Sequence, residues 1–379
     1  MFKQQTVVFR VDVQPVIGSG HLIRCLTLAS ALKETGAHCI FICSLLPDKF
    51  AGQILNAGFE LRLIPAVLEP FQKDAIGPDL REAWIADSES TISEIHNAIL
   101  NATIPTEKID WLIVDHYSID ARWERKLRSH VGHIFVIDDL VDRSHDCDIL
   151  LDQNFISGSM QSHTDPALQN TMQLLGPRFA LLREEFREAK KLSSRPRETL
   201  LKALIFFGAS DLTNETEKVL KAFSDDAFSE LQLTVVFGEM NTRSESLASM
   251  YGHRKNWRFM KTSAEMAKLM AEADFSIGAG GTTAWERCFL NLPTIITQVA
   301  ENQRQLSLSL AAQGAALDLG WHSNVSPEDY ARAARKLMSE NLLATKMSKA
   351  CERIFHQESD TVGAVVRAIK NFDTDLSAR

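Results

Sequence analysis

The sequence has no long apolar run. No segment approaches the roughly 20 apolar residues that a membrane-spanning helix needs. The first residues, MFKQQTVVFRV, become strand-like at once, without the apolar core and small-residue cleavage site of a secretory signal. We therefore expect a cytoplasmic protein with no membrane insertion.

Cysteine motifs are also missing. The six cysteines are scattered among mostly apolar neighbours, with no CxxC pair and no Cys/His finger spacing. This pattern favours buried, reduced thiols. Asp138, Asp139 and the run HDCD (145–148) admit a metal site, but acids that follow strands more often cap helices or line a cleft. We expect no metal and no other cofactor, and Cys147 is an even weaker candidate as a nucleophile.

An excess of positive charge is absent as well. The net charge of −8 argues against nucleic acid or a membrane surface as a partner. There is no short-period repeat. At 379 residues the chain exceeds the size at which one hydrophobic core keeps growing, which favours two domains.

Short apolar runs alternate with helical patterns along the whole chain. Such runs are typical of parallel strands that are covered on both faces. In the first half they lie at residues 6–11, 39–43, 111–115, 134–138 and 148–152, and in the second half at 203–207, 233–237, 257–260, 275–278 and 293–297. The sequence therefore predicts an α/β protein with two Rossmann-like, doubly wound domains.

A charged, helix-breaking stretch, EAKKLSSRPRE (188–198), interrupts this rhythm and is the predicted linker. We place an N-terminal domain at residues 1–190 and a C-terminal domain at residues 200–379. The last helical pattern, residues 360–372, could pack on either domain.

The loop GSGH (18–21) stands between a strand and a helix. Its glycines let the backbone approach a ligand closely, but Ile23 replaces the third glycine of a dinucleotide fingerprint, and no P-loop lysine is present. His21 can be an ordinary polar residue of the first helical turn. Alternatively, the positive helix end keeps its imidazole neutral and able to accept a proton, which would suit a general base.

The stretch SIGAGGTTAWERC (276–288) is the second candidate site. A strand runs into Gly278, Gly280 and Gly281, and Thr282 and Thr283 then open a helix. Flexible backbone, unpaired N–H groups and two hydroxyls predict a diphosphate cradle, with Glu286 one turn on and within reach of ribose hydroxyls. A tight strand-to-helix turn is the structural alternative. FGASD (207–211) repeats the pattern more weakly.

Seven motifs together carry a family resemblance. They are GSGHLIRCLTLA (18–29), IVDHYSID (113–120), CDILLDQN (147–154), GPRFALLREEF (176–186), FGASDLTN (207–214), GAGGTTAWERC (278–288) and ENQ (301–303). In this combination the chain closely resembles the bacterial UDP-2,4-diacetamido-2,4,6-trideoxy-β-L-altropyranose hydrolases of pseudaminic acid biosynthesis. Departures at Gln14, Ala209 and Asn291 could alter sugar contacts but leave the base and the cradle intact.

The resemblance implies a glycosyltransferase-B fold, in which two domains face each other across a cleft, and kinship with MurG transferases. It implies that His21 activates water for attack at the anomeric carbon with inversion. UDP would lie in the C-terminal domain, with Glu286 on the ribose and residues 280–283 on the diphosphate. Tyr117, Asn302 and Gln303 would face the sugar, although an interface tyrosine and a polar helix start would explain them equally well.

We further expect binding contributions from five residues. They are Gly18, Gly20, Arg24, Gly208 and Met260. Trp84, near Asp87 in a polar helical stretch, could edge the sugar pocket, but a solvated helix face is the simpler interpretation. The expected partner is a small UDP-sugar, and the released sugar would be destined for flagellin or a surface polysaccharide.

Two further functions stay open at this point. A glycosyltransferase of the same fold would pass the sugar to a hydroxyl acceptor, and it would want an apolar or basic membrane patch that the N-terminal half does not show. A binding module without catalysis would not need His21 beside a complete cradle.

Overall fold

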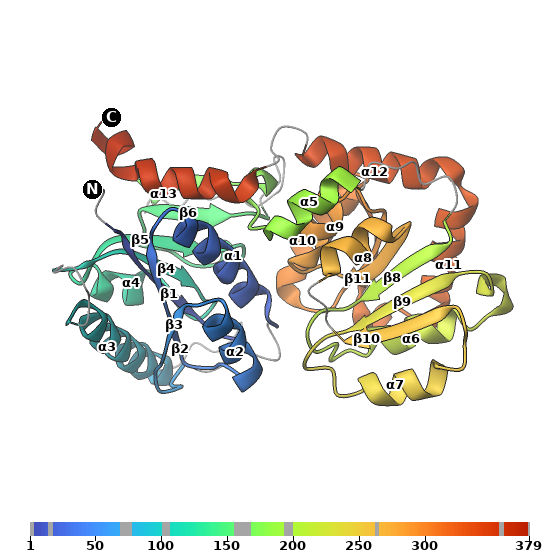
Figure 1. Ribbon diagram of the computed structural model, residues 1–379, viewed down its shortest axis with the longest axis horizontal. Helices are drawn as coiled ribbons and strands as arrows, with labels where there is room; N and C mark the ends of the chain where they lie inside the picture. The colour runs from blue at the N-terminus through green and yellow to red at the C-terminus, as the bar shows by residue number, and fades with distance from the viewer. Residues whose placement is uncertain are drawn as a thin grey trace. The chain divides into compact units, whose positions relative to one another are not determined.

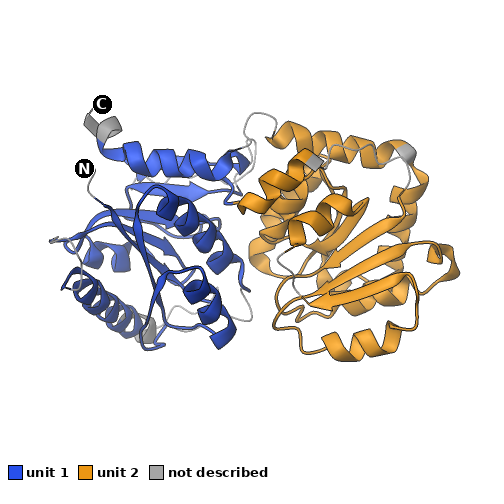
Figure 2. Cartoon of the chain, viewed as in Figure 1, with its two compact units in different colours: residues 1–181, 360–379 blue, residues 182–359 orange. Residues whose placement is uncertain are grey.

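The computed structural model describes residues 4–13, 18–68, 78–100, 107–154, 168–192, 200–261, 265–355 and 360–377. The chain divides into two compact units (Figure 2). Unit 1 comprises Met1–Leu181 and Asp360–Arg379, and unit 2 comprises Leu182–Ser359. No helix in the described ranges is both long enough and apolar enough to cross a membrane.

Unit 1 is built on a seven-stranded sheet in the order β3-β2-β1-β4-β5-β6-β7. Each pair of neighbouring strands is parallel. The strands are β1 (Thr6–Val11), β2 (His38–Cys43), β3 (Glu60–Leu63), β4 (Ile109–Asp115), β5 (Val131–Ile137), β6 (Ile149–Asp152) and β7 (Met172–Leu175). The central strands are mainly apolar and buried, as expected where helices cover both faces of the sheet (Figure 1).

The helices of unit 1 are α1 (Gly20–Glu34), α2 (Asp48–Asn56), α3 (Pro78–Leu100), α4 (Ala121–Leu127) and α13 (Thr361–Ser377). Ile95 of α3 and Trp123 of α4 join one core with Leu112 of β4. Trp111, next to Leu112, meets Phe372 of α13 with ring centroids 5.4 Å apart. Because successive strand residues point to opposite faces, α13 covers the other side of the sheet from α3 and α4. The C-terminal helix, whose position the sequence left open, therefore belongs to unit 1.

Unit 2 repeats this plan with six parallel strands in the order β10-β9-β8-β11-β12-β13. The strands are β8 (Lys202–Phe206), β9 (Gln232–Phe237), β10 (Trp257–Lys261), β11 (Phe275–Ala279), β12 (Thr294–Gln298) and β13 (Ala316–Trp321). The helices are α5 (Glu184–Leu192), α6 (Glu215–Ala222), α7 (Ser244–Tyr251), α8 (Met266–Glu272), α9 (Thr283–Phe289), α10 (Arg304–Ala312), α11 (Pro327–Ser339) and α12 (Asn341–Phe355).

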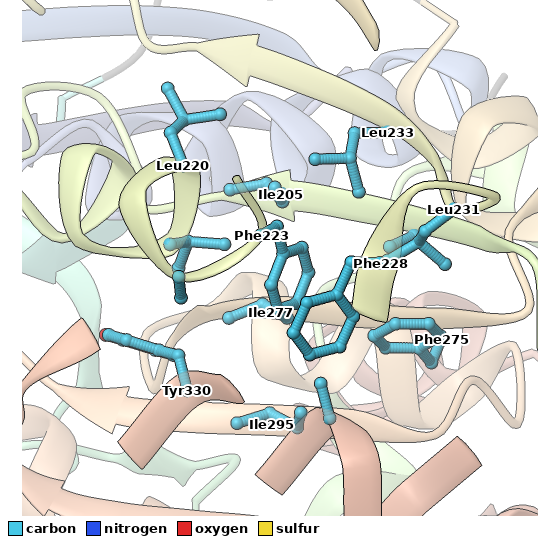
Figure 3. Packing of buried hydrophobic residues seen from close by; sticks show 14 of the residues in the cluster. Ile205, Leu220, Phe223, Phe228, Leu231, Leu233, Phe275, Ile277, Ile295 and Tyr330 are labelled. Atoms are coloured by element: carbon cyan, nitrogen blue, oxygen red, sulfur yellow. The ribbon is translucent and has the colours of Figure 1, made fainter. Parts of the chain in front are cut away.

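A hydrophobic core of unit 2 lies between the sheet and helices α6 and α11. Figure 3 shows Ile277 and Ile295 of the central strands next to Phe223, Phe228 and Tyr330. Phe223 and Phe228 stack with their ring centroids 4.6 Å apart. Burial of such large apolar side chains is what holds the helices on the sheet.

The ten strands expected from the sequence all form, within three residues at their ends. The expected boundary between the domains differs from that of the units. Residues 188–192, predicted to be linker, complete α5, because Phe186 and Ala189 are buried and α5 packs on α8 and α9 of unit 2. The rest of the predicted linker, residues 193–199, lies outside the described residues.

Candidate functional site

Each sheet has one point at which its strand order reverses. In unit 1 it lies between β1 and β4, and in unit 2 between β8 and β11. Open α/β sheets bind ligands at the carboxyl ends of the strands at such points. The predicted residues follow these four strands: His21 after β1, Tyr117 after β4, Gly208 after β8, and residues 280–283 after β11.

His21 lies in the first turn of α1 and is only 6% exposed. Its Nδ1 is 2.9 Å from Oδ1 of Asp115, at the end of β4. Its Nε2 is buried and meets no hydrogen-bonding partner among the residues described. The Tyr117 ring stands edge-on to the imidazole, with centroids 4.5 Å apart. A carboxylate at Nδ1 favours the tautomer that carries its proton there, which leaves Nε2 as a proton acceptor.

Asp115 is a site residue that the sequence did not single out. Arg24, one turn after His21, grips it with two bonds, Nε to Oδ2 at 2.6 Å and Nη2 to Oδ1 at 2.7 Å. Burial alone would raise the pKa of Asp115, but Arg24 and then His21 hold this pKa well below its usual range. Asp115 is therefore a fixed negative charge behind the imidazole.

Asp139, after β5, gathers three of its neighbours. It accepts hydrogen bonds from Arg24 Nη1 at 3.1 Å, from the Tyr117 hydroxyl at 2.8 Å and from Asn154 Nδ2 at 2.8 Å. Arg24 thus bridges Asp115 and Asp139. Arg24, Tyr117, Asp139 and Asn154 therefore form one hydrogen-bonded group next to His21 and Asp115.

The acids considered for a metal site are engaged with cations. Asp138 pairs with Arg143 at 2.7 Å and lies 3.5 Å from His145 Nε2, while His145 Nδ1 is 2.7 Å from Glu124. Burial opposes protonation of His145, but its hydrogen bonds to Asp138 and Glu124 raise its pKa to about 9. Across the described ranges no group of three or more His, Cys, Asp or Glu is arranged to hold a metal ion.

Trp84 and Asp87 do not form a solvated face of α3. The Trp84 indole donates to the Ser118 carbonyl at 2.5 Å and lies under the Arg122 guanidinium. Asp87 is fully buried and pairs with Arg10 at 2.7 Å. The solvated-face expectation is wrong for Asp87, because a buried arginine on the neighbouring sheet requires a counter-charge.

In unit 2, the glycine loop after β11 is held by Gln303. The side-chain Oε1 of Gln303 accepts from the backbone N–H groups of Gly280 at 3.2 Å and Val299 at 3.3 Å. A Cβ at Gly280 would overlap Ser307 Oγ, whereas one at Gly281 would make ordinary contacts. Packing against Ser307 thus requires glycine at position 280, whereas position 281 has space for a side chain. Thr282 precedes α9 and makes no side-chain capping bond.

Glu286 lies on α9 and is 4% exposed. Its Oε1 accepts from Arg183 Nη2 at 3.2 Å, while its Oε2 is buried and lacks a hydrogen-bonding partner in the part of the chain that is described. The next residue, Arg287, is also buried and donates to the Ala279 carbonyl under the loop. Burial lowers the pKa of Arg287 to about 10, so it stays a cation at neutral pH.

The remaining predicted residues are more dispersed. Gly18 and Gly208 adopt left-handed φ angles of 82° and 85°, which favour glycine. Gly20 is the first residue of α1. Asn302 precedes Gln303 in a short 3-10 turn. Met260 lies half-buried on β10, which is separated from β8 by β9. Gln14 lies outside the described residues.

Comparison with known proteins defines the class. Residues 204–362 match the glycosyltransferase family 28 C-terminal domain. MurG of Acinetobacter baumannii superposes with a TM-score of 0.62 at 15% identity, over 97% of this chain and 99% of that one. Phytolacca americana UGT2, solved with UDP-2-fluoro-glucose and pterostilbene, superposes with a TM-score of 0.65 at 12% identity, over 98% and 100%. The chain has the glycosyltransferase-B fold, as its sequence predicted.

Three known proteins are similar to this chain in sequence. The UDP-2,4-diacetamido-2,4,6-trideoxy-β-L-altropyranose hydrolase of Campylobacter jejuni is 24% identical over 309 residues, 81% of this chain and 97% of that protein. The spore coat polysaccharide biosynthesis protein SpsG of Bacillus subtilis is 25% identical over 257 residues, 67% and 74%. An uncharacterised protein of Methanocaldococcus jannaschii is 23% identical over 76% of this chain, which spans only 54% of that relative. The predicted resemblance to the hydrolase family is confirmed.

Proposed function

We propose that this protein hydrolyses UDP-2,4-diacetamido-2,4,6-trideoxy-β-L-altropyranose to UDP and the free sugar. The observation that carries the proposal is the state of His21, whose Nδ1 is held by Asp115 while its buried Nε2 has no partner among the described residues. An imidazole fixed in this way is ready to take a proton. The hydrolase from Campylobacter jejuni, which aligns over nearly its whole length, supplies the substrate class.

The reaction is a single displacement. His21 Nε2 takes a proton from water as the water oxygen forms a bond to the anomeric carbon. The bond between that carbon and the phosphate oxygen breaks on the opposite side, and its electron pair leaves with UDP, so the anomeric configuration inverts. The negative charge of Asp115 stabilises the imidazolium that forms. The diphosphate leaves as an anion and needs no strong general acid.

The proposal assigns the nucleotide to unit 2. Glu286 would accept from ribose hydroxyls, and the backbone of residues 280–283 would donate to the diphosphate. Gly208 would give room beside that loop, and Asn302 and Gln303 would reach the sugar. Support comes from the family match to residues 204–362 and from the Phytolacca enzyme of the same fold, which was solved with a UDP-sugar.

A transferase is the second candidate. MurG shares the fold over nearly the whole chain, and the base at His21 would deprotonate a hydroxyl acceptor as readily as water.

The hydrolase proposal also includes a cytoplasmic location and a place in a route to pseudaminic acid. The Bacillus relative is named for polysaccharide biosynthesis, which fits a sugar destined for a cell-surface polymer.

One experiment separates these functions. The purified protein is incubated with the UDP-sugar and no acceptor, and UDP and free sugar are followed by chromatography and NMR. A hydrolase releases both in equal amounts, and the first free sugar has the inverted configuration. Release only after addition of a hydroxyl acceptor would establish a transferase. UDP-sugar binding without turnover in either case would establish a binding module and end the proposal.

A further inference from the structure

The motif GPRFALLREEF places an arginine, Arg183, that the proposed reaction does not use. Arg183 is the second residue of unit 2 and precedes α5. Its Nη2 donates to Glu286 Oε1 at 3.2 Å, and its Nη1 pairs with Glu185 Oε1 at 2.8 Å. The guanidinium also lies 5.1 Å from the ring centroid of Phe186. The Arg183 guanidinium therefore pairs with the carboxylates of Glu286 and Glu185 and packs near the Phe186 ring.

Glu286 can accept a further hydrogen bond. Glu286 Oε2 is buried, and nothing in the described part of the chain donates to it. A buried acceptor without a donor destabilises the folded chain, and a charged one does so more strongly. This destabilisation is removed when a ligand brings the missing donor. Glu286 therefore has one oxygen fixed by the protein and one oxygen left for something else.

The ligand group must supply a proton, because Glu286 Oε2 is a hydrogen-bond acceptor. Charges are equal in number here, since Glu286 and Glu185 stand beside two guanidiniums, those of Arg183 and of the buried Arg287. A fully ionised phosphate has no proton to donate, whereas an uncharged hydroxyl donates one. The vicinal hydroxyls of a ribose are such groups.

We propose that Arg183 is a positioning residue that orients Glu286 for a ribose hydroxyl and so makes the site selective for nucleotides with an intact ribose. Arg183 holds Oε1, and Oε2 accepts from the sugar. The inference rests on the proposed function, because it takes the ligand of unit 2 to be a nucleoside diphosphate. It adds to that function one residue, Arg183, and a selectivity for ribose over a sugar without hydroxyl groups.

The test compares binding of UDP and 2′,3′-dideoxy-UDP by calorimetry. Wild-type protein should bind UDP about 10–100-fold more tightly, the usual value of a hydrogen bond to a charged acceptor. Arg183→Gln should reduce this ratio to a few-fold, mainly by weakening UDP, with dideoxy-UDP affinity unchanged. Arg183→Lys, which keeps the charge without the two-armed fork, should fall between.

Arg187→Gln is the matched control, since Arg187 lies on α5, the helix that begins directly after Arg183, is exposed and pairs with Glu184 at 2.9 Å. It should keep the wild-type ratio, and melting temperatures should show that all variants fold. A wild-type ratio in Arg183→Gln would overturn the inference. So would an equal loss for both ligands, since that would place Arg183 on the phosphates. Failure of the wild type to bind UDP at all would instead remove the proposed function.

Discussion

The two units share one plan and differ in what they place at the point where the strand order reverses. In unit 1 the strand ends carry polar and charged side chains: His21, Arg24, Asp115 and Asp139 are linked by ion pairs and hydrogen bonds with distances of 2.6–3.1 Å. In unit 2 the corresponding loop after β11 consists of glycines and threonines, and its fixed contacts are to backbone N–H groups. The shared topology thus selects the place, and the loop residues select the chemistry.

The difference assigns separate tasks to the units. The proposed base, His21, lies in unit 1, and the proposed nucleotide surface, a glycine loop with the buried Glu286 beside it, lies in unit 2. If this division is correct, substitutions in unit 1 should change the rate, and substitutions in unit 2 should change nucleotide affinity.

Removal of the base should have the largest effect. His21→Asn keeps a polar side chain but cannot take a proton, so turnover should fall about 10²–10⁴-fold. UDP affinity and melting temperature should stay close to those of the wild type, because the proposed nucleotide contacts are all in unit 2. The acidic limb of the pH–rate profile should vanish from the residual activity. Hydrolysis within a few-fold of the wild-type rate would exclude His21 as the base.

Alkaline pH should weaken unit 1 through His145. Its pKa is about 9 in the folded chain and about 6.5 when unfolded, so the folded state holds more protons between these values. The stabilisation is complete below pH 6.5 and is lost as pH rises through 9, in total on the order of 3 kcal/mol. Urea unfolding of wild type and His145→Gln at pH 6.5 and 9.5 measures it by difference.

Subtraction of the variant cancels the contribution of the cysteines, because burial raises the pKa of their thiols in the folded chain and they ionise in this range only after unfolding. Asp211 of unit 2, whose pKa burial raises to about 6, titrates below this window. His253→Gln, an exposed histidine of unit 2, is the control and should leave the pH dependence unchanged. Parallel pH curves for wild type and His145→Gln would show that His145 carries no linked proton.

The sequence predicted the central strands and one edge strand, β10, and missed the other three edge strands. Buried central strands are mainly apolar runs, which are easily recognised. β3 (ELRL), β7 (MQLL) and β13 (ALDLGW) lie at sheet edges, are only partly buried, and include polar or charged residues. These three strands are held in their sheets by hydrogen bonds to a neighbouring strand, and no local sequence pattern reveals that pairing.

The site shows the same limit. His21 and Glu286 were recognisable from the glycine loops beside them. Asp115 lies 94 residues from His21 in the sequence, and Arg183 lies 103 residues from Glu286, so only the folded chain brings each pair together. A useful signal was present, since Asp115 and Arg183 both lie within the motifs IVDHYSID and GPRFALLREEF. Their partners could not be assigned without the sheet order.

Loss of the ribose contact should affect binding more than chemistry. Glu286→Ala should weaken UDP about 10–100-fold and raise KM by a similar factor, with a smaller change in kcat, because the ribose changes little between ground and transition states. Calorimetry and steady-state kinetics on one preparation measure both. His21→Asn provides the opposite control, with affinity retained and rate lost. Unchanged UDP affinity in folded Glu286→Ala would remove the ribose role.

The smallest effects should come from alanine at two glycines that differ in their reason for being glycine. Gly18 has φ of 82° and open space around it, so Gly18→Ala should lower the free energy of unfolding by about 1 kcal/mol through backbone strain alone. Gly281 has neither a strained φ nor a crowded Cβ position, so Gly281→Ala should unfold at nearly the wild-type urea concentration.

Gly281→Ala nevertheless adds a methyl group where the diphosphate is proposed to approach the backbone. UDP affinity should therefore fall while stability does not, and uridine, which lacks phosphates, should bind as it does to the wild type. Gly18→Ala should show the reverse, a loss of stability with UDP affinity unchanged. If Gly281→Ala and Gly18→Ala both bound UDP as tightly as the wild type, the loop after β11 would be only a tight turn. The proposed role of unit 2 in binding the nucleotide would then be wrong for this loop.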